Sequence, residues 1–194
     1  MSYLDGHVEL TPKDPHDWLH QIASMLVCIH DTNIAAPAAE SWLDRAKLEV
    51  PKWSTRPDVW REAIALVKES PPDVIPCFVH HDYQQFNLLW QRGGLTSVVD
   101  WVWGSSGSTG IDVGHARLNL SVLYSSELAQ EFLKLYESLS GSTVDPWWDV
   151  EGLLKYLPGW GDFLQLQAGR RLNVDFEGMH ERVEATLVSA LRRS

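Results

Sequence analysis

Hydrophobic patterning divides this chain into a short central region with the pattern of β-strands and longer regions with the pattern of helices. Residues 74–79 and 95–103 are rich in β-branched and apolar side chains, and a Gly-Gly pair at 93–94 marks a turn before the second run. Residues 87–100 are therefore predicted to form a hairpin. Elsewhere apolar residues recur at three- and four-residue steps, the spacing of one helix face. This spacing predicts helices at 15–30, 57–69, 112–124, 126–139, 146–156, 162–171 and 176–193, with a short helix within 40–48.

Size and composition favour a single folded domain over residues 1–194, and the predicted helices and strands favour an α+β, mainly α, architecture. A chain of 194 residues can bury about 70% of the surface that its unfolded form exposes. Ten tryptophans, each a large apolar side chain with one donor that needs a partner, argue against disorder. Neither an internal repeat nor a linker divides the sequence.

The formal net charge of -10 limits the classes of partner. Nucleic acids and anionic membranes bind non-specifically to basic surfaces, so neither is expected as a partner. The charge is compatible with a cationic substrate, although most acidic proteins are merely soluble. No apolar run approaches the roughly 20 residues of a membrane span, and the N-terminus lacks the features of a signal peptide. A cytoplasmic location is therefore expected, and Cys28 and Cys77, which lack metal or redox spacing, are predicted to be buried free thiols.

The sharpest motif is the pattern His-x-Asp-x-x-x-x-Asn at His80, Asp82 and Asn87, followed by Asp100 at the end of an apolar run. Phosphoryl transfer from ATP needs an acceptor hydroxyl held in line and metal ions that neutralise the phosphates. A loop aspartate can orient the hydroxyl and accept its proton. An asparagine and an aspartate at the two ends of a hairpin can bind magnesium, which prefers hard oxygen ligands. The hairpin is expected to bring Asn87 and Asp100 to one edge, near Asp82.

This stretch resembles the catalytic loop of the aminoglycoside phosphotransferase and choline kinase superfamily, which is related to the protein kinases. The family usually has His-Gly-Asp-x-x-x-x-Asn, followed by a hydrophobic pair and Asp-Trp or Asp-Phe. Here His81 stands where glycine is usual, so a positive φ at this position would carry a cost. The resemblance covers nearly the whole chain and implies the C-terminal lobe of a protein-kinase-like fold. Short hairpins would lie at the catalytic cleft, and residues 1–7 would be a remnant of the interlobe hinge.

The resemblance implies a role for each matching residue. Asp82 would be the catalytic aspartate, and Asn87 and Asp100 would be the magnesium ligands. His80 and Asp112 would be structural, because the family uses the corresponding residues to hold the catalytic loop.

The resemblance also implies the cofactors and the reaction. ATP and Mg²⁺ would be the cofactors, and Leu89 would lie under the base of the nucleotide. The reaction would be transfer of the γ-phosphate to a hydroxyl of a small molecule. An aminoglycoside, a macrolide, a choline-like compound or an unknown metabolite could be the acceptor.

A kinase of this type also has a smaller N-terminal lobe, with a loop over the phosphates, a strand lysine and a glutamate that pairs with it. None of these parts is found in the sequence, so the C-terminal lobe alone is expected. Such a lobe would bind ATP weakly, turn over slowly or not at all, and expose a cleft face through which it could self-associate. The alternative function is a non-catalytic binding or interaction module. A third hypothesis is metal-dependent hydrolysis by Asp82 and Asp100.

Other polar and aromatic residues are interpreted as structural. His30 is expected to pack or cap at the end of its helix, and His115 to be a core or surface residue. Trp147 and Trp148 are expected to pack. Residues 104–110 are predicted to be a flexible loop at the position of the family's abbreviated activation segment. Acidic residues near the C-terminus could bind a cationic substrate, but a solvated face is favoured for them: Asp145, Asp149, Glu151 and Asp162.

Overall fold

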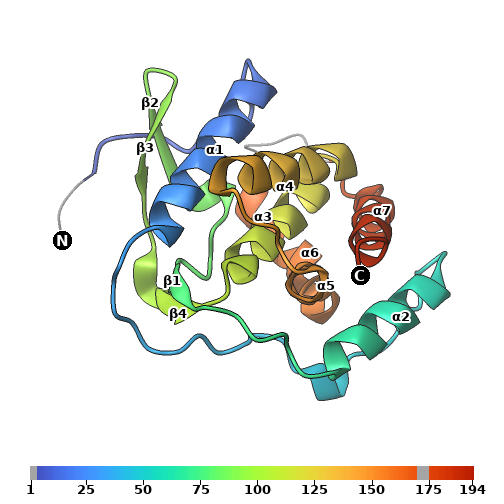
Figure 1. Ribbon diagram of the computed structural model, residues 1–194. Coiled ribbons are helices and arrows are strands. Elements are labelled where there is room, and N and C mark those ends of the chain that lie inside the picture. Colours follow the sequence, from blue (N-terminus) through green and yellow to red (C-terminus); the bar gives the residue numbers. More distant parts are fainter. Residues whose placement is uncertain (1–3, 170–174) are drawn as a thin grey trace.

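The computed structural model describes residues 4–169 and 175–194 and has a helical body with two small sheets along one side (Figure 1). The helix at residues 109–123 is central and contacts four other helices. The helix at residues 57–68 packs at the periphery against two of these four. Because the strands lie beside the body, the loops between them are held at its surface. The helices are α1 (Pro15–His30), α2 (Pro57–Lys68), the central α3 (Thr109–Leu123), α4 (Ser126–Ser140), α5 (Pro146–Leu154), α6 (Gly161–Ala168) and α7 (Met179–Leu191).

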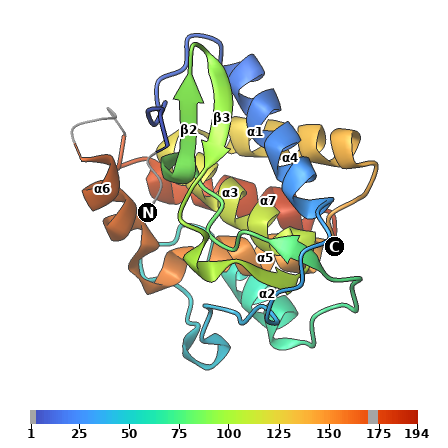
Figure 2. The same cartoon turned by 90° about the vertical axis from the view of Figure 1, so that its left-hand side faces the viewer.

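Each sheet is a pair of antiparallel strands, and both pairs lie on the same side of the helices (Figure 2). Strand β1 (Cys77–Val79) pairs with β4 (Ser105–Gly107). Strand β2 (Leu88–Gln91) pairs with β3 (Gly94–Val98) and forms the predicted hairpin. The loop that carries the catalytic motif therefore runs from the first sheet to the second.

Of two local predictions, one is confirmed in a short form and one is wrong. Within residues 40–48 the structure has a short 3₁₀ helix, Arg45–Lys47, after Asp44, whose carboxylate caps it through the N–H of Ala46. Residues 105–107 form β4 instead of a flexible loop. The reason is that Ser106 pairs on two sides, with β1 and with residues 37–39, whose backbone it contacts through bonds of 2.7 and 2.8 Å.

The remaining helices have the predicted order, with shifts of a few residues at their ends. The helix predicted at 162–171 ends at Ala168, and its last two positions lie outside the described residues.

Both cysteines are free, but the prediction that both are buried is wrong, because Cys28 is exposed on α1. Among the described helices, none is long and apolar enough to cross a membrane.

The central helix α3 is unusual because its residues from Gly110 to Leu123 are all buried. Burial of polar groups is costly unless they find partners, and most polar side-chain atoms of this helix do find them, the Nδ1 of His115 being an exception. Arg117, for example, is paired with Asp149 of α5 and donates to the backbone oxygen of Ala129 at 3.0 Å. Toward the N-terminal end of α3, the buried side chains of Asp112 and His115 likewise find partners, in the loop of the candidate site.

Close packing of α3 against α5 depends on two glycines. A Cβ atom placed on Gly152 would lie 2.6 Å from the Cα of Gly114, so any side chain at this crossing would push the helices apart. This contact fixes α5 against α3. It thereby places Glu151 and Lys155 of the α5 region beneath the candidate site.

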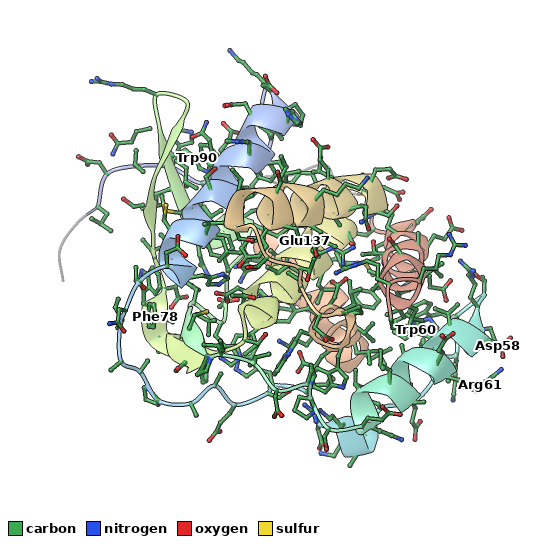
Figure 3. The ribbon with its side chains drawn as sticks, in the orientation of Figure 1. Asp58, Trp60, Arg61, Phe78, Trp90 and Glu137 are labelled. Atoms are coloured by element: carbon green, nitrogen blue, oxygen red, sulfur yellow. The ribbon has the colours of Figure 1, made fainter. Side chains whose placement is uncertain are left out.

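Aromatic side chains account for much of the remaining core. Trp60 points from α2 toward α7, while Asp58 and Arg61 point away from the body (Figure 3). The indole N–H of Trp60 donates to Glu184 of α7 at 2.8 Å. Trp147 is also buried in this core and Trp148 packs against it, as predicted.

Candidate active site

The loop that follows β1 is anchored from below by Asp112. The carboxylate of this residue is fully buried and accepts hydrogen bonds from the backbone N–H groups of His80 and His81, at 2.7 and 2.6 Å. It also accepts one from His30 Nε2 at 3.1 Å, and His30 in turn contacts the hydroxyl of Tyr136 at 2.7 Å. Burial acts to raise the pKa of Asp112, but the bonds from His30 and the loop outweigh it, so the pKa lies below its usual value. An ionised carboxylate therefore fixes the loop.

His80 ties the same loop to the end of the β2–β3 hairpin. Its Nε2 donates to the backbone oxygen of Val99 at 2.8 Å, and its Nδ1 accepts from the N–H of Asp82 at 3.3 Å. The side chain is completely buried. Through these contacts His80 joins the loop to the base of the hairpin.

His81, where the resemblance has glycine, has a φ of 72°. This is the left-handed region, which costs about 1–2 kcal/mol for residues other than glycine, although histidine is among those that occur there more often. The ring compensates by stacking on Trp42 at a centroid distance of 4.6 Å, and its Nδ1 lies 3.3 Å from the hydroxyl of Ser105. Tertiary contacts therefore allow a histidine at a position suited to glycine.

The buried ring of His81 leads us to expect that acid destabilises the protein. Burial, with a smaller effect of Lys155, lowers the pKa of His81 to about 4. Between about pH 6.5 and 4 the unfolded chain then binds a proton here that the folded chain does not, so stability falls as the pH falls through this window. The loss should reach roughly 3 kcal/mol at the lower end. His81→Asn removes the titrating group and suits a positive φ.

Urea denaturation at several pH values between 7 and 4 measures this effect. The free energy of unfolding of the His81→Asn variant should fall less steeply with acidification than that of the natural protein. His20→Asn, on the exposed face of α1, is the matched control and should leave the slope unchanged. Equal slopes for the natural protein and His81→Asn would contradict the assignment.

Asp82 lies at the centre of the loop and is half-buried. Its carboxylate accepts hydrogen bonds from Gln84 Nε2 at 2.8 Å, from Asn87 Nδ2 at 3.0 Å and from His115 Nε2 at 3.0 Å. Burial acts to raise the pKa of Asp82, but the bonds from His115, Asn87 and Gln84 outweigh it, so the pKa lies below its usual value. The group is an oriented, ionised carboxylate that can accept a proton.

Asn87 and Asp100 lie at the two ends of the hairpin, and Val99 links them to the loop. The N–H of Val99 donates to the backbone oxygen of Asn87 at 2.9 Å, while its carbonyl accepts from His80. Asp100 follows at once, with an exposed side chain and a φ of 64°. The structure thus places the backbones of Asn87 and Asp100 near each other at the base of the hairpin, and Asn87 is bonded directly to Asp82.

The donor set at this edge is compatible with magnesium. Asn87 uses its amide nitrogen on both the carboxylate and the backbone oxygen of Asp82, which leaves the amide oxygen for another partner. With the exposed carboxylate of Asp100, this makes two hard oxygen donors, and magnesium takes most of its other ligands from water and phosphate. Within the described ranges, no group of three or more His, Cys, Asp or Glu side chains is placed to hold a metal ion.

Comparison with known proteins decides the family. The model of one family, described as the phosphotransferase enzyme family, matches residues 1–164, a range that includes the loop, the hairpin and α3. The chain belongs to the phosphotransferase enzyme family. A search of curated proteins found no significant match.

Solved structures of phosphotransferases have a similar fold. One is described as a putative aminoglycoside phosphotransferase from Ralstonia eutropha, with a TM-score of 0.63 and 14% identity over 100% of this chain and 73% of that one. A choline kinase from Streptococcus pneumoniae gives 0.55 and 18% over 92% and 64%, and a macrolide 2′-phosphotransferase from Brachybacterium faecium gives 0.55 and 15% over 95% and 67%. At these identities the likeness shows the fold alone. The chain spans between 62% and 73% of the length of structures such as these.

Leu89 is half-buried on β2, against the segment that resembles a hinge. A Cβ atom on Gly6 would lie 2.9 Å from the Cβ of Leu89, so the backbone at Gly6 passes directly over this side chain. The next residue, His7, pairs with Trp90 through backbone bonds of 3.1 and 2.8 Å. Residues 6–7 therefore extend the edge of the hairpin.

His115 is a site residue that the sequence reasoning missed. It is completely buried, as a core residue would be, but its Nε2 contacts the carboxylate of Asp82. Burial lowers the pKa of His115, and the bond to Asp82 only partly opposes this, so the ring is neutral and its Nε2 donates a proton to the bond. The available signal was its position three residues after Asp112 on one helix, since residues at this spacing are neighbours.

An aromatic pocket beside Asp82 was also missed. It has a volume of about 280 Å³ and is lined by side chains from segments that are far apart in the sequence. The excess of tryptophan was the only hint, because no motif connects these segments. The lining residues are Trp42, Asp82, Gln84, Trp103, Trp160 and Phe163.

Proposed function

We propose that this chain is a catalytic lobe, over residues 1–194, that transfers the γ-phosphate of ATP to a hydroxyl of a small molecule. The observation that carries the proposal is Asp82, an ionised carboxylate held by three donors at the wall of a pocket. A carboxylate placed in this way can accept a hydrogen bond from an acceptor hydroxyl that enters the pocket. It can also take the proton as the hydroxyl attacks phosphorus.

Nucleotide binding is supported by structures with a similar fold. One neighbour is the protein LicA in complex with AMP, and another is an amicoumacin kinase in complex with AMP-PNP, Ca²⁺ and Ami. A third is a ternary complex of an aminoglycoside phosphotransferase with streptomycin and ATP. In our proposal the apolar side chain of Leu89 lies under the base, next to the segment at Gly6.

Asn87 and Asp100 would hold the magnesium ion in this proposal. When bound, the metal supplies positive charge that neutralises the phosphate oxygens. The residues of the chain have separate tasks: the amide of Asn87 also positions Asp82, and Asp82 acts on the acceptor. His80 and Asp112 keep the loop in one conformation, so that the carboxylate does not have to be ordered during the reaction.

The function is tested by incubating the protein with Mg-ATP and a panel of aminoglycosides, macrolides, amino alcohols and neutral glycosides. Mass spectrometry should detect one acceptor with an added phosphoryl group, in an amount that matches the ADP formed. Release of phosphate without a modified acceptor would instead favour metal-dependent hydrolysis. Nucleotide binding without either product would favour the non-catalytic module.

Removal of the proposed metal ligands should weaken nucleotide binding that depends on magnesium. In the double variant Asn87→Ala, Asp100→Ala, we expect the affinity for Mg-AMP-PNP to fall by tenfold or more, or about 1.4 kcal/mol, because both hard oxygen donors are lost. Isothermal titration calorimetry with and without magnesium measures the difference.

The control is the double variant Asn33→Ala, Asp73→Ala, which removes the same two groups from exposed positions. This variant should bind Mg-AMP-PNP like the natural protein. An unchanged affinity in the first double variant would remove Asn87 and Asp100 from the metal site.

A further inference from the structure

We propose that the aromatic pocket beside Asp82 binds an uncharged acceptor, through a ring that stacks on its tryptophan and phenylalanine side chains, in preference to a polycationic aminoglycoside. The inference rests on the proposed function, since it assumes that the acceptor reaches Asp82. It names the class of acceptor that the walls of the pocket select. Four observations support it: the aromatic lining of the pocket, its volume, the buried Lys155 beneath it, and the partners and positions of the nearby acidic residues.

The pocket walls present ring faces and edges in a fixed arrangement. Trp160 donates its indole N–H to Asn119 at 2.9 Å, and its ring lies 5.0 Å from that of Phe163, measured between centroids. Trp42 and Trp103 meet edge to face at 5.4 Å. Exposed fractions of 53% for Trp103 and 47% for Phe163 show that these two rings are open at the rim. A ligand with an apolar ring face can therefore bury aromatic surface here.

The size of the pocket suits one ring. Small-molecule sites usually have volumes of about 300–1,000 Å³, and this pocket, at about 280 Å³, lies at the lower end. An aminoglycoside with several linked rings would have to leave most of its amines outside the pocket. Those amines would then need carboxylates around the rim.

The charge beneath the pocket opposes a cationic ligand. The ammonium group of Lys155 lies 5.6 Å from the ring centre of Trp42, and the same ring is stacked on His81. Lys155 is buried and paired with Glu151 at 3.4 Å, yet it still contributes, after burial, to the lowered pKa of His81 and of His115. Asp112 and Glu151 act on the pKa of His81 in the opposite direction. Because the ammonium group of Lys155 already lies over the Trp42 ring, a second cation on that ring would be repelled by Lys155 at short range, whereas an uncharged ring would not.

Within the described part of the chain, Asp82 is the one carboxylate that lines the pocket, and it already accepts hydrogen bonds from other side chains. Its two oxygens already accept hydrogen bonds from His115, Gln84 and Asn87, which take up most of its capacity to accept further ones. It retains the capacity to accept one bond from a hydroxyl. It is a poor partner for several ammonium groups.

The acidic residues that the sequence analysis considered as partners for a cationic substrate either have other partners or lie outside the pocket lining. Asp149 is buried and paired with Arg117 and Arg193, and Glu151 is buried and accepts from the hydroxyl of Ser41. Asp145 caps the N-terminus of α5. Asp162, on α6, is exposed, but it does not line the pocket.

The reaction in this pocket is balanced with ATP as the phosphoryl donor. The acceptor oxygen forms a bond to the γ-phosphorus, and the bond from that phosphorus to the bridging oxygen of ADP breaks. The proton of the hydroxyl passes to the carboxylate of Asp82. The products are the phosphorylated acceptor and ADP.

The test compares the binding of three probes to the protein by calorimetry: phenyl β-D-glucopyranoside, which is neutral, kanamycin, which is polycationic, and choline, which is a single cation. We expect the glucoside to bind most tightly, with an affinity that does not change between low and high salt, because screening acts on charges alone. Trp103→Ala and Phe163→Ala should each weaken its binding about tenfold. Val102→Ala and Leu166→Ala, exposed neighbours of these residues outside the pocket lining, should leave it unchanged.

Tighter binding of kanamycin or choline than of the glucoside, or no binding of the glucoside, would overturn the inference. Equal loss in the control variants would also overturn it, because binding would then lie outside the pocket. Turnover separates this failure from failure of the proposed function. If kanamycin or choline is phosphorylated and Asp82→Asn abolishes the reaction, the function stands and only the acceptor class is wrong.

Discussion

The variant Asp82→Asn is expected to lose phosphoryl transfer by about 10²–10⁴-fold, the usual contribution of a general base, while nucleotide binding stays within a factor of two or three. The side chain of asparagine has the same shape and can still accept hydrogen bonds from His115 and Gln84 through its oxygen. It cannot take a proton from the acceptor. The loss should therefore appear in the maximal rate and not in the affinity for ATP.

The measurement is the rate of acceptor phosphorylation at saturating Mg-ATP, together with calorimetry for nucleotide binding. It is made on residues 1–194 and also on these residues joined to an N-terminal lobe of a related kinase. Asp73→Asn, an exposed aspartate in the segment before β1, is the control and should be fully active. Full activity of Asp82→Asn in a form that turns over would contradict the role given to this residue.

The variant Asp112→Asn should be strongly destabilised, although only one atom changes its chemistry. The carboxylate of Asp112 is completely buried and accepts from the backbone of His80 and His81 and from the ring of His30. An amide has one oxygen, so its NH₂ group would face a donor, and a buried donor without a partner costs about 1–3 kcal/mol. With the charge-assisted bonds also lost, we expect the free energy of unfolding to fall by roughly 3 kcal/mol.

Urea denaturation at pH 7 measures this loss, and the activity of the folded fraction gives a second readout. The loop that carries Asp82 should move when its anchor is removed, so the turnover of the variant should fall even where the protein remains folded. Asp31→Asn, at the exposed C-terminal end of α1, provides a control of the same chemistry. A loss below about 1 kcal/mol would show that Asp112 does not hold the loop in the manner described.

The helical framework and the hairpin were predictable because both follow from local patterns. Apolar spacing defined α1, α2, α4 and α7, and a turn at Gly93 between two apolar runs defined the hairpin. Local patterns failed for Ser106, because nothing near a Gly-Ser-Thr segment indicates that it will pair on two sides. Pairing of this kind depends on β1 and on residues 37–39, which are distant in the sequence.

The candidate site was predictable where its residues share a motif and unpredictable where they do not. Asp82 and Asn87 are close in the sequence and in space, joined by a hydrogen bond of 3.0 Å. Asp112 was found by resemblance, and its bonds to the loop give that resemblance a physical basis. His115 and Trp42 reach the site from a buried helix and an irregular segment, and nothing local distinguishes them from core residues.

His81 illustrates how a departure from a family pattern can be tolerated. The sequence raised the question of whether a histidine could take a glycine position, and the φ of 72° shows that it does take a left-handed conformation. Stacking on Trp42 provides the compensation. The Trp42 ring that makes this possible also lines the pocket beside Asp82, so the exchange of glycine for histidine is linked to the proposed acceptor site.

The central claim is that Asp82, Asn87 and Asp100 form the catalytic site of a kinase, and a crystal structure with AMP-PNP and Mg²⁺ tests it most directly. We expect the metal to bind the amide oxygen of Asn87 and the carboxylate of Asp100, and the γ-phosphate to face Asp82 across the mouth of the aromatic pocket. Asp82 itself should remain bound to His115 and Gln84 and should not be a metal ligand. A metal bound by Asp82 in place of Asn87, or a nucleotide bound away from this loop, would contradict the claim.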